Sequence, residues 1–273
     1  MNTHVADHYA GSADLLQAIE QRLQSDGKDP AQINTADLAS VDEFHIRGRK
    51  ATLELAQRMR LTRDDHVLDI GSGLGGPART LAESCGCRVT GIDVTREFCE
   101  AATGLSEWVD LHERVEFRHA DATSMPFDDN RFDAAMTIHV AMNIWAKDRV
   151  YAEAKRVLKP GGIFAVYDVL QGEGGDVLYP VPWAREPSIS HLATPAEMES
   201  LLTQAGFGIL EINDSTEESQ TWFEQMAASM QETGAPKLGF QIFLGDDFPL
   251  MARNQVRNLT ERRIRTVTYV CEA

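Results

Sequence analysis

Short apolar runs alternate with longer segments of helical character through the middle of this chain of 273 residues. The first five predicted strands are His66–Ile70, Arg88–Asp93, Val115–Asp121, Arg131–His139 and Gly162–Leu170. Strands that alternate with helices form a parallel sheet, which helices cover on both faces. Strands buried on both faces are apolar along nearly their whole length, as several of these are. The alternation therefore predicts an α/β fold with a mostly parallel, doubly covered sheet.

The N-terminal part of the chain reads as helical. Leu15, Leu16, Ile19 and Leu23 recur at helical spacing, and a second helix is expected from about Gly48 to Met59. The pattern changes at about residue 60, where the strands begin. We therefore predict two units, an N-terminal helical lid over residues 1–60 and a main domain over residues 61–273.

The C-terminal part continues the alternation. Thr194-Pro195-Ala196-Glu197 has the form of a capping box that begins a helix. Phe207–Asp214 predicts a sixth strand, and the β-branched segment at the end of the chain predicts a seventh. Two helices are expected between them, near residues 215–233 and 246–258. These two helices have two open roles, covering an acceptor pocket or forming a dimer face, so the oligomeric state is not predicted.

The charge balance limits the partners. Lys and Arg total 26 against 42 Asp and Glu, a net charge of −16. Such a surface repels phosphate backbones and anionic membranes, so we expect neither nucleic acid nor membrane as a partner. No apolar stretch approaches the roughly 18–20 residues that span a bilayer, and no secretory signal is recognised. The four cysteines, Cys85, Cys87, Cys99 and Cys271, match no zinc or redox spacing. We expect a reduced, cytoplasmic protein without a metal site.

The strongest local motif is the glycine-rich segment between the first strand and the next helix. It reads Asp69-Ile70-Gly71-Ser72-Gly73-Leu74-Gly75-Gly76-Pro77. The glycines allow a tight turn and a close approach of a ligand to the backbone, and the helix start aims N–H groups at that ligand. Asp93, at the end of the second strand, is placed to bind a ribose diol. A nicotinamide-dependent dehydrogenase uses the same two features, so NAD binding is open at this point.

Further motifs separate these alternatives. Asp121 follows the third strand, Phe132-Asp133 opens the fourth, and Leu158-Lys159-Pro160-Gly161-Gly162 precedes the fifth. Together with the glycine loop and Asp93, this ordered set resembles the class I S-adenosylmethionine-dependent methyltransferases over roughly residues 61–214. The resemblance implies a Rossmann-like seven-stranded sheet whose last strand is antiparallel and lies between strands five and six. A dehydrogenase is not expected to carry the Leu-Lys-Pro-Gly-Gly turn or Asp121, and no hydride-transfer group is found.

The resemblance also implies roles for individual residues around S-adenosylmethionine. Gly71 and Gly73 would line the amino-acid and ribose parts, and Asp69 would favour the ammonium group. Asp93 would bind both ribose hydroxyls, and Val94 would pack on the adenine. Asp121 and the Ala122 N–H would bind adenine nitrogens, and His139 would lie near the methionine part.

The methyl acceptor is less defined, because in-line methyl transfer mainly requires orientation and exclusion of water. The N-terminal segment around Glu43–Arg49 resembles the lid of glycine, sarcosine and dimethylglycine N-methyltransferases and of quinone C-methyltransferases. The acceptor is therefore open between an amine or amino acid and a quinone or phenol. His45 and His139 are weak candidates for a base, and Arg47 or Arg49 for holding a carboxylate. Further residues expected to face the acceptor are Tyr9, Phe44, Met142, Asn143, Trp145, Tyr179, Trp183 and Arg185.

The leading prediction is a cytosolic small-molecule methyltransferase. Two other classes stay open from the sequence, an NAD-dependent oxidoreductase and a non-catalytic nucleotide-binding module that keeps the pocket.

Overall fold

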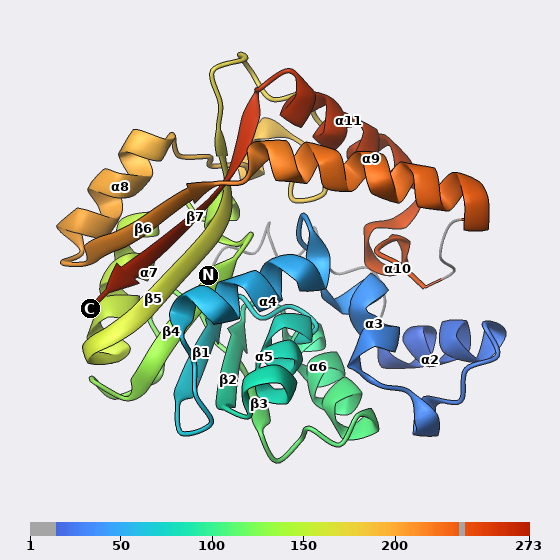
Figure 1. Cartoon of the computed structure of the whole chain (residues 1–273), viewed down its shortest axis with the longest axis horizontal. Coiled ribbons are helices and arrows are strands. Elements are labelled where there is room, and N and C mark those ends of the chain that lie inside the picture. The colour runs from blue at the N-terminus through green and yellow to red at the C-terminus, as the bar shows by residue number, and fades with distance from the viewer. Residues whose placement is uncertain (1–14, 235–237) are drawn as a thin grey trace.

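A seven-stranded sheet of order β3-β2-β1-β4-β5-β7-β6 forms the centre of the molecule (Figure 1). The computed structural model describes residues 15–234 and 238–273. Strands β1 to β5 pair in parallel, whereas β7 is antiparallel to both β5 and β6. The strands are β1 (His66–Ile70), β2 (Arg88–Asp93), β3 (Val115–His119), β4 (Phe132–Ile138), β5 (Leu158–Gln171), β6 (Gly208–Asp214) and β7 (Ile264–Glu272). The predicted Rossmann-like sheet with an antiparallel last strand is confirmed.

Helices surround this sheet. The α-helices are α2 (Leu15–Ser25), α3 (Thr35–Asp42), α4 (Gly48–Met59), α5 (Gly76–Cys85), α6 (Arg96–Trp108), α7 (Lys147–Val157), α8 (Pro195–Gln204), α9 (Thr216–Thr233), α10 (Gln241–Leu244) and α11 (Phe248–Thr260). Short 3-10 helices are η1 (Pro30–Gln32), η2 (Ala141–Asn143), η3 (Pro187–Ile189) and η4 (Gly245–Asp247). The predicted capping box of α8 is present, with Thr194 and Glu197 each bonded to the other's backbone.

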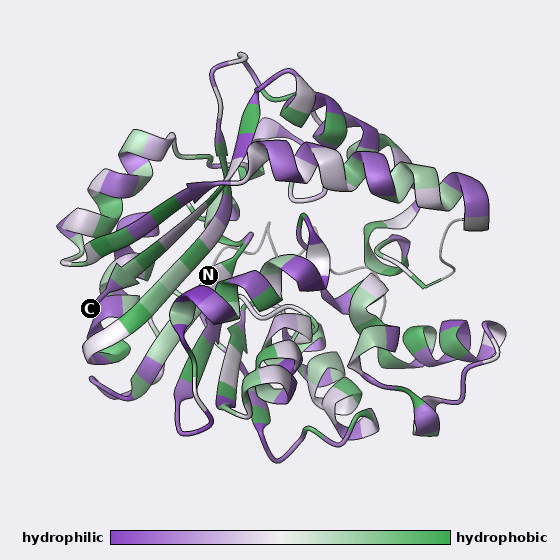
Figure 2. Cartoon of the chain, in the orientation of Figure 1, coloured by the Kyte–Doolittle hydropathy of each residue, from purple (hydrophilic) through white to green (hydrophobic). Residues whose placement is uncertain are grey.

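The central strands β4 and β5 are buried on both faces, whereas the edge strand β6 is largely exposed, and alternate residues of one central strand serve the two faces. In β5, Phe164 and Val166 join a core with α7 and α8, whereas Ala165 and Tyr167 join a core with α4 and α5. The strands are accordingly green along most of their length in Figure 2, while the helices carry both colours. This continuous apolar character explains why the strands could be located from the sequence.

The N-terminal helices pack in two different places. Helix α4 packs on the sheet through Leu55 and Met59, next to α5. Helices α2 and α3 belong to a separate cluster, in which Ile19 and Leu38 lie with Phe98 of α6 and Phe243 of α10. The division at residue 60 remains a prediction.

Three local features differ from the expectations. Helices α3 and α10, with 8 and 4 residues, were not predicted, because such short segments carry little periodic signal. Strand β3 ends at His119 rather than at Asp121. Leu158 already pairs with Phe132, and Ile163 with Ala134, so the predicted turn at 159–162 forms an irregularity inside β5.

Arg79 of α5 ties the N-terminal helices to the glycine loop. Its side chain is 0% exposed. The guanidinium donates to Asp42 Oδ2 at 2.7 Å, to the Leu74 carbonyl at 2.5 Å and to the Ala102 carbonyl at 3.1 Å. Burial raises the pKa of Asp42 to about 6, although Arg79 acts in the opposite direction. The pair therefore joins α3, the glycine loop and α6 at one buried point.

Arg79→Leu is expected to lower the free energy of unfolding by about 3–5 kcal/mol, because it leaves the buried Asp42 without its partner. Urea denaturation measures this loss. Arg49→Leu is the matched control, since Arg49 pairs with the partly exposed Glu83 and surface pairs contribute about 0–1 kcal/mol. Equal losses in the two variants would contradict the assignment of Arg79 as a structural tie.

Candidate active site

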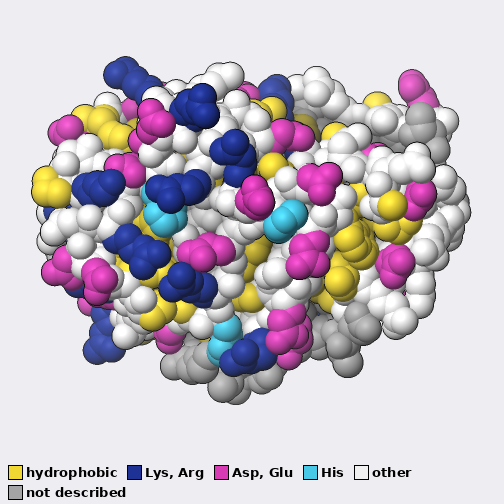
Figure 3. All heavy atoms as spheres, turned by 90° about the horizontal axis from the view of Figure 1, so that it is seen from below, with side chains coloured by type: hydrophobic (Ala, Val, Ile, Leu, Met, Phe, Trp, Pro, Cys, Tyr) yellow, Lys and Arg dark blue, Asp and Glu magenta, His cyan; other side chains and the backbone are white. Residues whose placement is uncertain are grey.

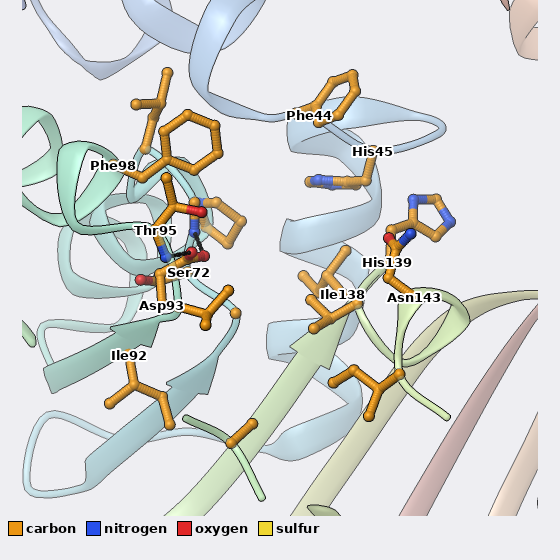
Figure 4. A pocket seen from close by; sticks show the side chains of 18 of the residues that line it. Phe44, His45, Ser72, Ile92, Asp93, Thr95, Phe98, Ile138, His139 and Asn143 are labelled. Carbon is orange, nitrogen blue, oxygen red and sulfur yellow. Dashed lines mark hydrogen bonds between the residues drawn. The ribbon is translucent and has the colours of Figure 1, made fainter. Parts of the chain in front are cut away.

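A cavity of about 480 Å³ lies at the carboxyl ends of the parallel strands, which is where ligands bind in open α/β sheets. Figure 4 shows two walls facing each other across it. Ser72, Asp93, Thr95 and Phe98 lie on one wall, and Phe44, His45, Ile138, His139 and Asn143 lie on the other. The cavity is therefore bounded by the glycine loop, the end of β2, the end of β4 and the segment before α4.

The glycine loop has the conformation that its sequence predicts. Gly71, Gly73 and Gly75 all have positive φ angles, of 79°, 51° and 80°. A Cβ atom on Gly71 would lie only 2.4 Å from Val140 Cγ2, so this position excludes a side chain. A Cβ atom on Gly73 would meet nothing within 4 Å, so the space beside it is open to a ligand. Gly71 and Gly73 both line the cavity.

Asp93 lines the cavity from the end of β2. Its Oδ2 accepts a hydrogen bond from the Gly73 N–H at 2.9 Å, and its Oδ1 accepts one from the Thr95 N–H at 2.8 Å. Burial raises the pKa of Asp93, and these two N–H donors act against the rise. The carboxylate thus links the glycine loop to the start of α6 and faces the cavity in a fixed orientation.

The segments that follow β2 and β3 supply the adjoining part of the wall. Val94, Asp121 and Ala122 all line the cavity. Asp121 Oδ1 accepts hydrogen bonds from the Thr123 N–H at 2.9 Å and from the Thr123 hydroxyl at 2.7 Å. The structure therefore brings these residues, predicted to surround ribose and adenine, to one side of one cavity.

Asp69 is placed differently from the other predicted cofactor residues. It lies within β1, is 2% exposed and is not part of the cavity lining. Burial raises its pKa to about 8, with further contributions from Asp93 and Glu43. Burial and the neighbouring carboxyl groups thus disfavour the charged form of Asp69.

His139 follows β4 directly and lines the cavity. Its φ angle is 53°, and its backbone N–H donates to the Tyr167 carbonyl at 2.8 Å. Its Nδ1 accepts from the Ile46 N–H at 3.2 Å, which leaves the proton on Nε2. That Nε2 is buried and has no hydrogen-bond partner among the described residues. His139 therefore offers a donor, and burial holds its pKa well below the ordinary value.

His45 also carries its ring proton on Nε2. Its Nε2 lies 2.9 Å from the Gly48 carbonyl, an acceptor, so Nε2 carries the proton and Nδ1 is left as a lone pair. The Thr52 hydroxyl lies 3.2 Å from the same nitrogen and donates to Glu43 Oε2 at 2.7 Å. Burial lowers the pKa of His45 to about 4. The wall of the cavity thus contains a neutral imidazole whose orientation is fixed from behind.

Glu43 is the buried acidic side chain behind this imidazole, and no sequence pattern pointed to its role. It is 1% exposed, and Oε2 lies 3.7 Å from His45 Nε2. The Thr80 hydroxyl donates to its Oε1 at 2.6 Å, in addition to the bond from Thr52. Burial raises the pKa of Glu43, and the two hydroxyl donors act against the rise.

The residues expected to face the acceptor divide into two groups. Phe44, Asn143 and Trp145 line the cavity, and Trp145, 82% exposed, lies at its rim. Met142, Tyr179 and Trp183 instead belong to a core cluster with α9 and α11. Arg185 pairs with Asp247 at the surface. Tyr9 lies outside the described residues.

Neither Arg47, just before α4, nor Arg49, in its first turn, is available for a ligand carboxylate. Arg47 is 7% exposed and donates to both oxygens of Glu54 at 2.6 Å. Arg49 pairs with Glu83. Neither lines the cavity. The sequence could not show these pairs, because the partners lie 7 and 34 residues away.

Several lining residues were not predicted. Ser72, Thr95 and Phe98 follow predicted residues closely along the chain, so their neighbours were a usable signal. Phe243 comes from α10, more than a hundred residues away, and nothing in the sequence pointed to it. It packs with Phe44 and Phe98 at ring-centroid distances of 5.1 and 5.7 Å. These rings pack on one another rather than enclosing an open space for a cation.

Comparisons with known proteins agree with this site. The methyltransferase domain family matches residues 68–166. The methyltransferase GfsG of Streptomyces halstedii is 31% identical over 223 residues, 79% of this chain and 77% of that protein. The sterol 24-C-methyltransferase erg6 of Schizosaccharomyces pombe is 31% identical over 60% of this chain and only 45% of its own length. The structure of Haemonchus contortus phosphoethanolamine N-methyltransferase 2 has a TM-score of 0.71 at 19% identity, covering 93% of this chain and 59% of that one.

The chain belongs to the class I S-adenosylmethionine-dependent methyltransferases. It is an enzyme that transfers a methyl group from S-adenosylmethionine to a small molecule. This finding decides against the nicotinamide-dependent oxidoreductase and against the non-catalytic module.

Two further observations concern only the part of the chain that the structure describes. No group of three or more His, Cys, Asp or Glu side chains there is arranged to hold a metal ion. No helix in residues 15–234 or 238–273 is long and apolar enough to cross a bilayer.

Proposed function

We propose that the cavity binds S-adenosylmethionine with Asp93 on the ribose hydroxyls, and Val94, Asp121 and Ala122 around the adenine. The open, side-chain-free surface at Gly73 supports a close approach of the cofactor to the backbone. The unpartnered Nε2–H of His139 supports a hydrogen bond to a ligand oxygen. The residues thus fit the cofactor, which when bound supplies a methyl group on an electrophilic sulfonium. Asp69 lies outside the cavity lining, so we propose that it acts on the ammonium group only through the loop.

The acceptor that fits this cavity is uncharged and largely apolar. No lysine or arginine is found among the described residues that line the cavity, so a phosphate or carboxylate acceptor would lack a cationic partner. The Phe44, Phe98 and Phe243 cluster supplies apolar contact instead. This absence of cations argues against amino-acid acceptors, although an amine was open from the sequence.

A hydroxyl or phenol is the acceptor group that these residues serve best. The single observation that carries this proposal is the lone pair on His45 Nδ1, fixed by the bond from Nε2–H to the Gly48 carbonyl. The acceptor oxygen would give its proton to His45 Nδ1 as its bond to the methyl carbon forms and the bond between that carbon and the cofactor sulfur breaks. The imidazolium formed is stabilised by Glu43, 3.7 Å away, and the proton then passes to water. Of the predicted lid, residues 1–60, the end of α3 and the segment through His45 line the cavity, and we propose that this part excludes water during this step.

A panel of acceptors tests this proposal. The full chain is incubated with methyl-labelled S-adenosylmethionine and, separately, a substituted phenol, a hydroquinone, a macrocyclic alcohol, sarcosine and phosphoethanolamine. We expect label transfer only to the uncharged O–H compounds. Faster transfer to sarcosine or phosphoethanolamine would overturn the proposed acceptor class, while binding of S-adenosylmethionine, measured in parallel, would leave the cofactor assignment standing.

A further inference from the structure

A second hollow lies at the amino ends of the parallel strands, opposite the end that carries the methyl-transfer cavity. Its volume is about 330 Å³, and its lining includes the first residues of β1, β2 and β3. The charged and titratable lining residues are His66, Arg88, His112, Glu113, Arg114, Glu116, Arg118 and Arg131. We call this site the arginine hollow. In Figure 3, which views the molecule from below, Lys and Arg side chains gather around a histidine on one part of the face.

The local charge of the arginine hollow opposes the charge of the whole molecule. Four arginines line it against two glutamates, whereas the chain carries a net charge of −16. Glu116 is already bound to Arg118 at 3.1 Å and to the Thr90 hydroxyl at 2.9 Å. Arg88 and Arg131 have no ion-pair partner anywhere in the described residues. Two guanidinium groups consequently remain available to an anion.

Part of this arrangement is held in place before any ligand binds. The Arg131 guanidinium lies 5.2 Å from the centre of the Phe127 ring and 5.5 Å from that of Phe132. Arg118 also contacts the Phe127 ring, at 5.5 Å. Because Phe132 is 0% exposed and Phe127 is 7% exposed, the rings are a fixed base for both groups. Such stacked guanidinium groups lose little conformational freedom on binding.

The pKa of His66 is affected by the charges around the arginine hollow. Its Nε2 lies 2.8 Å from the Thr90 hydroxyl at the base of the site. Burial lowers the pKa of His66, and the charges of Arg88 and Arg131 lower it further, against the opposite effect of Glu116 and Asp133. The two unpaired arginines therefore both act on the His66 imidazole, although Arg88 begins β2 and Arg131 precedes β4.

We propose that the arginine hollow is a second ligand site, which binds the phosphate group of a small anionic molecule. Planar guanidinium groups bind phosphate oxygens in pairs, and arginine is preferred over lysine where that geometry matters. The volume admits a diphosphate or a small phosphate ester. The site lies at the amino ends of the strands, whereas the methyl-transfer cavity lies at their carboxyl ends, so the two ligands bind independently.

Calorimetry with inorganic pyrophosphate at low salt tests this proposal on the full chain. We expect saturable binding by the wild type and a loss of about tenfold or more in Arg88→Gln/Arg131→Gln. The control is Arg253→Gln, on the exposed surface of α11 outside the hollow, and its affinity should equal that of the wild type. S-adenosylmethionine affinity should be the same in all three proteins, which shows that the double variant is folded.

Several results would overturn the proposed phosphate site. Absence of saturable binding by the wild type would overturn the proposal, and so would equal affinity in the double variant. Vesicles with and without phosphatidic acid distinguish a lipid headgroup from a free molecule. Cosedimentation that depends on phosphatidic acid and is lost in Arg88→Gln/Arg131→Gln would assign the phosphate to a lipid and overturn the small-molecule assignment.

Discussion

Asp93→Ala is expected to weaken the affinity for S-adenosylmethionine by about 10²- to 10⁴-fold. A hydrogen bond to a charged group contributes about 1.5–3 kcal/mol, and the variant removes the two proposed bonds to the ribose hydroxyls. It also removes the acceptor of the Gly73 and Thr95 N–H groups, so the glycine loop loses its connection to α6. Isothermal titration calorimetry measures the change.

Two further variants serve as comparisons for the affinity of Asp93→Ala. Asp93→Asn keeps one carbonyl oxygen for the backbone donors, so its affinity should fall between those of the wild type and Asp93→Ala. Asp64→Ala removes a carboxylate from an exposed turn and should change nothing. An Asp93→Ala affinity within threefold of the wild type would remove Asp93 from the cofactor site.

His45→Ala is expected to lower kcat for an O–H acceptor by about 10²- to 10⁴-fold, the usual contribution of a general base. Affinity for S-adenosylmethionine should change little, because the imidazole serves the acceptor. Single-turnover rates with a phenol that reacts in the acceptor panel measure the effect. His112→Ala, which removes an exposed histidine outside the cavity, is the control. A normal rate in His45→Ala would show that deprotonation does not pass through this residue.

The pH dependence distinguishes a base from a merely structural imidazole. The pKa of His45 is lowered to about 4, so the neutral, proton-accepting form is present above that pH and is lost as the pH falls through it. We expect a rate that is flat between about pH 5 and pH 8 and that declines toward pH 4. His45→Ala should remove this decline, because the variant lacks the titrating imidazole. A decline of the same shape in His45→Ala would assign the titration to another group.

Much of the sheet could be predicted from the sequence, because strands such as β1 and β4 are apolar on both faces, and β1 is followed directly by Gly71. The antiparallel position of β7 came from the resemblance to a family, since periodicity gives a strand but not its direction. The short helices α3 and α10 could not be predicted, because they are shaped by contacts such as Arg79–Asp42 and Phe243–Phe98 that join distant segments.

The site could be predicted where its residues follow strand ends, as Gly71, Asp93, Asp121 and His139 do. The tautomers of His45 and His139 could not, because the groups that fix them are backbone atoms of Gly48 and Ile46. The raised pKa of Asp69 likewise depends on burial and on nearby carboxyl groups from other segments, which only the folded structure brings together.

The insertion of β7 between β5 and β6 has a consequence for synthesis on the ribosome. Strand β6 pairs with β7 alone, and its residues are made fifty positions before those of β7. Until β7 leaves the exit tunnel, β5 and β6 each present an unpaired edge, and such edges invite association with other chains. The cofactor side of the sheet, from β3 to β5, is complete long before. A nascent chain can therefore assemble β1 to β5 early, while the opposite margin of the sheet depends on β7, the strand of this sheet that is made last.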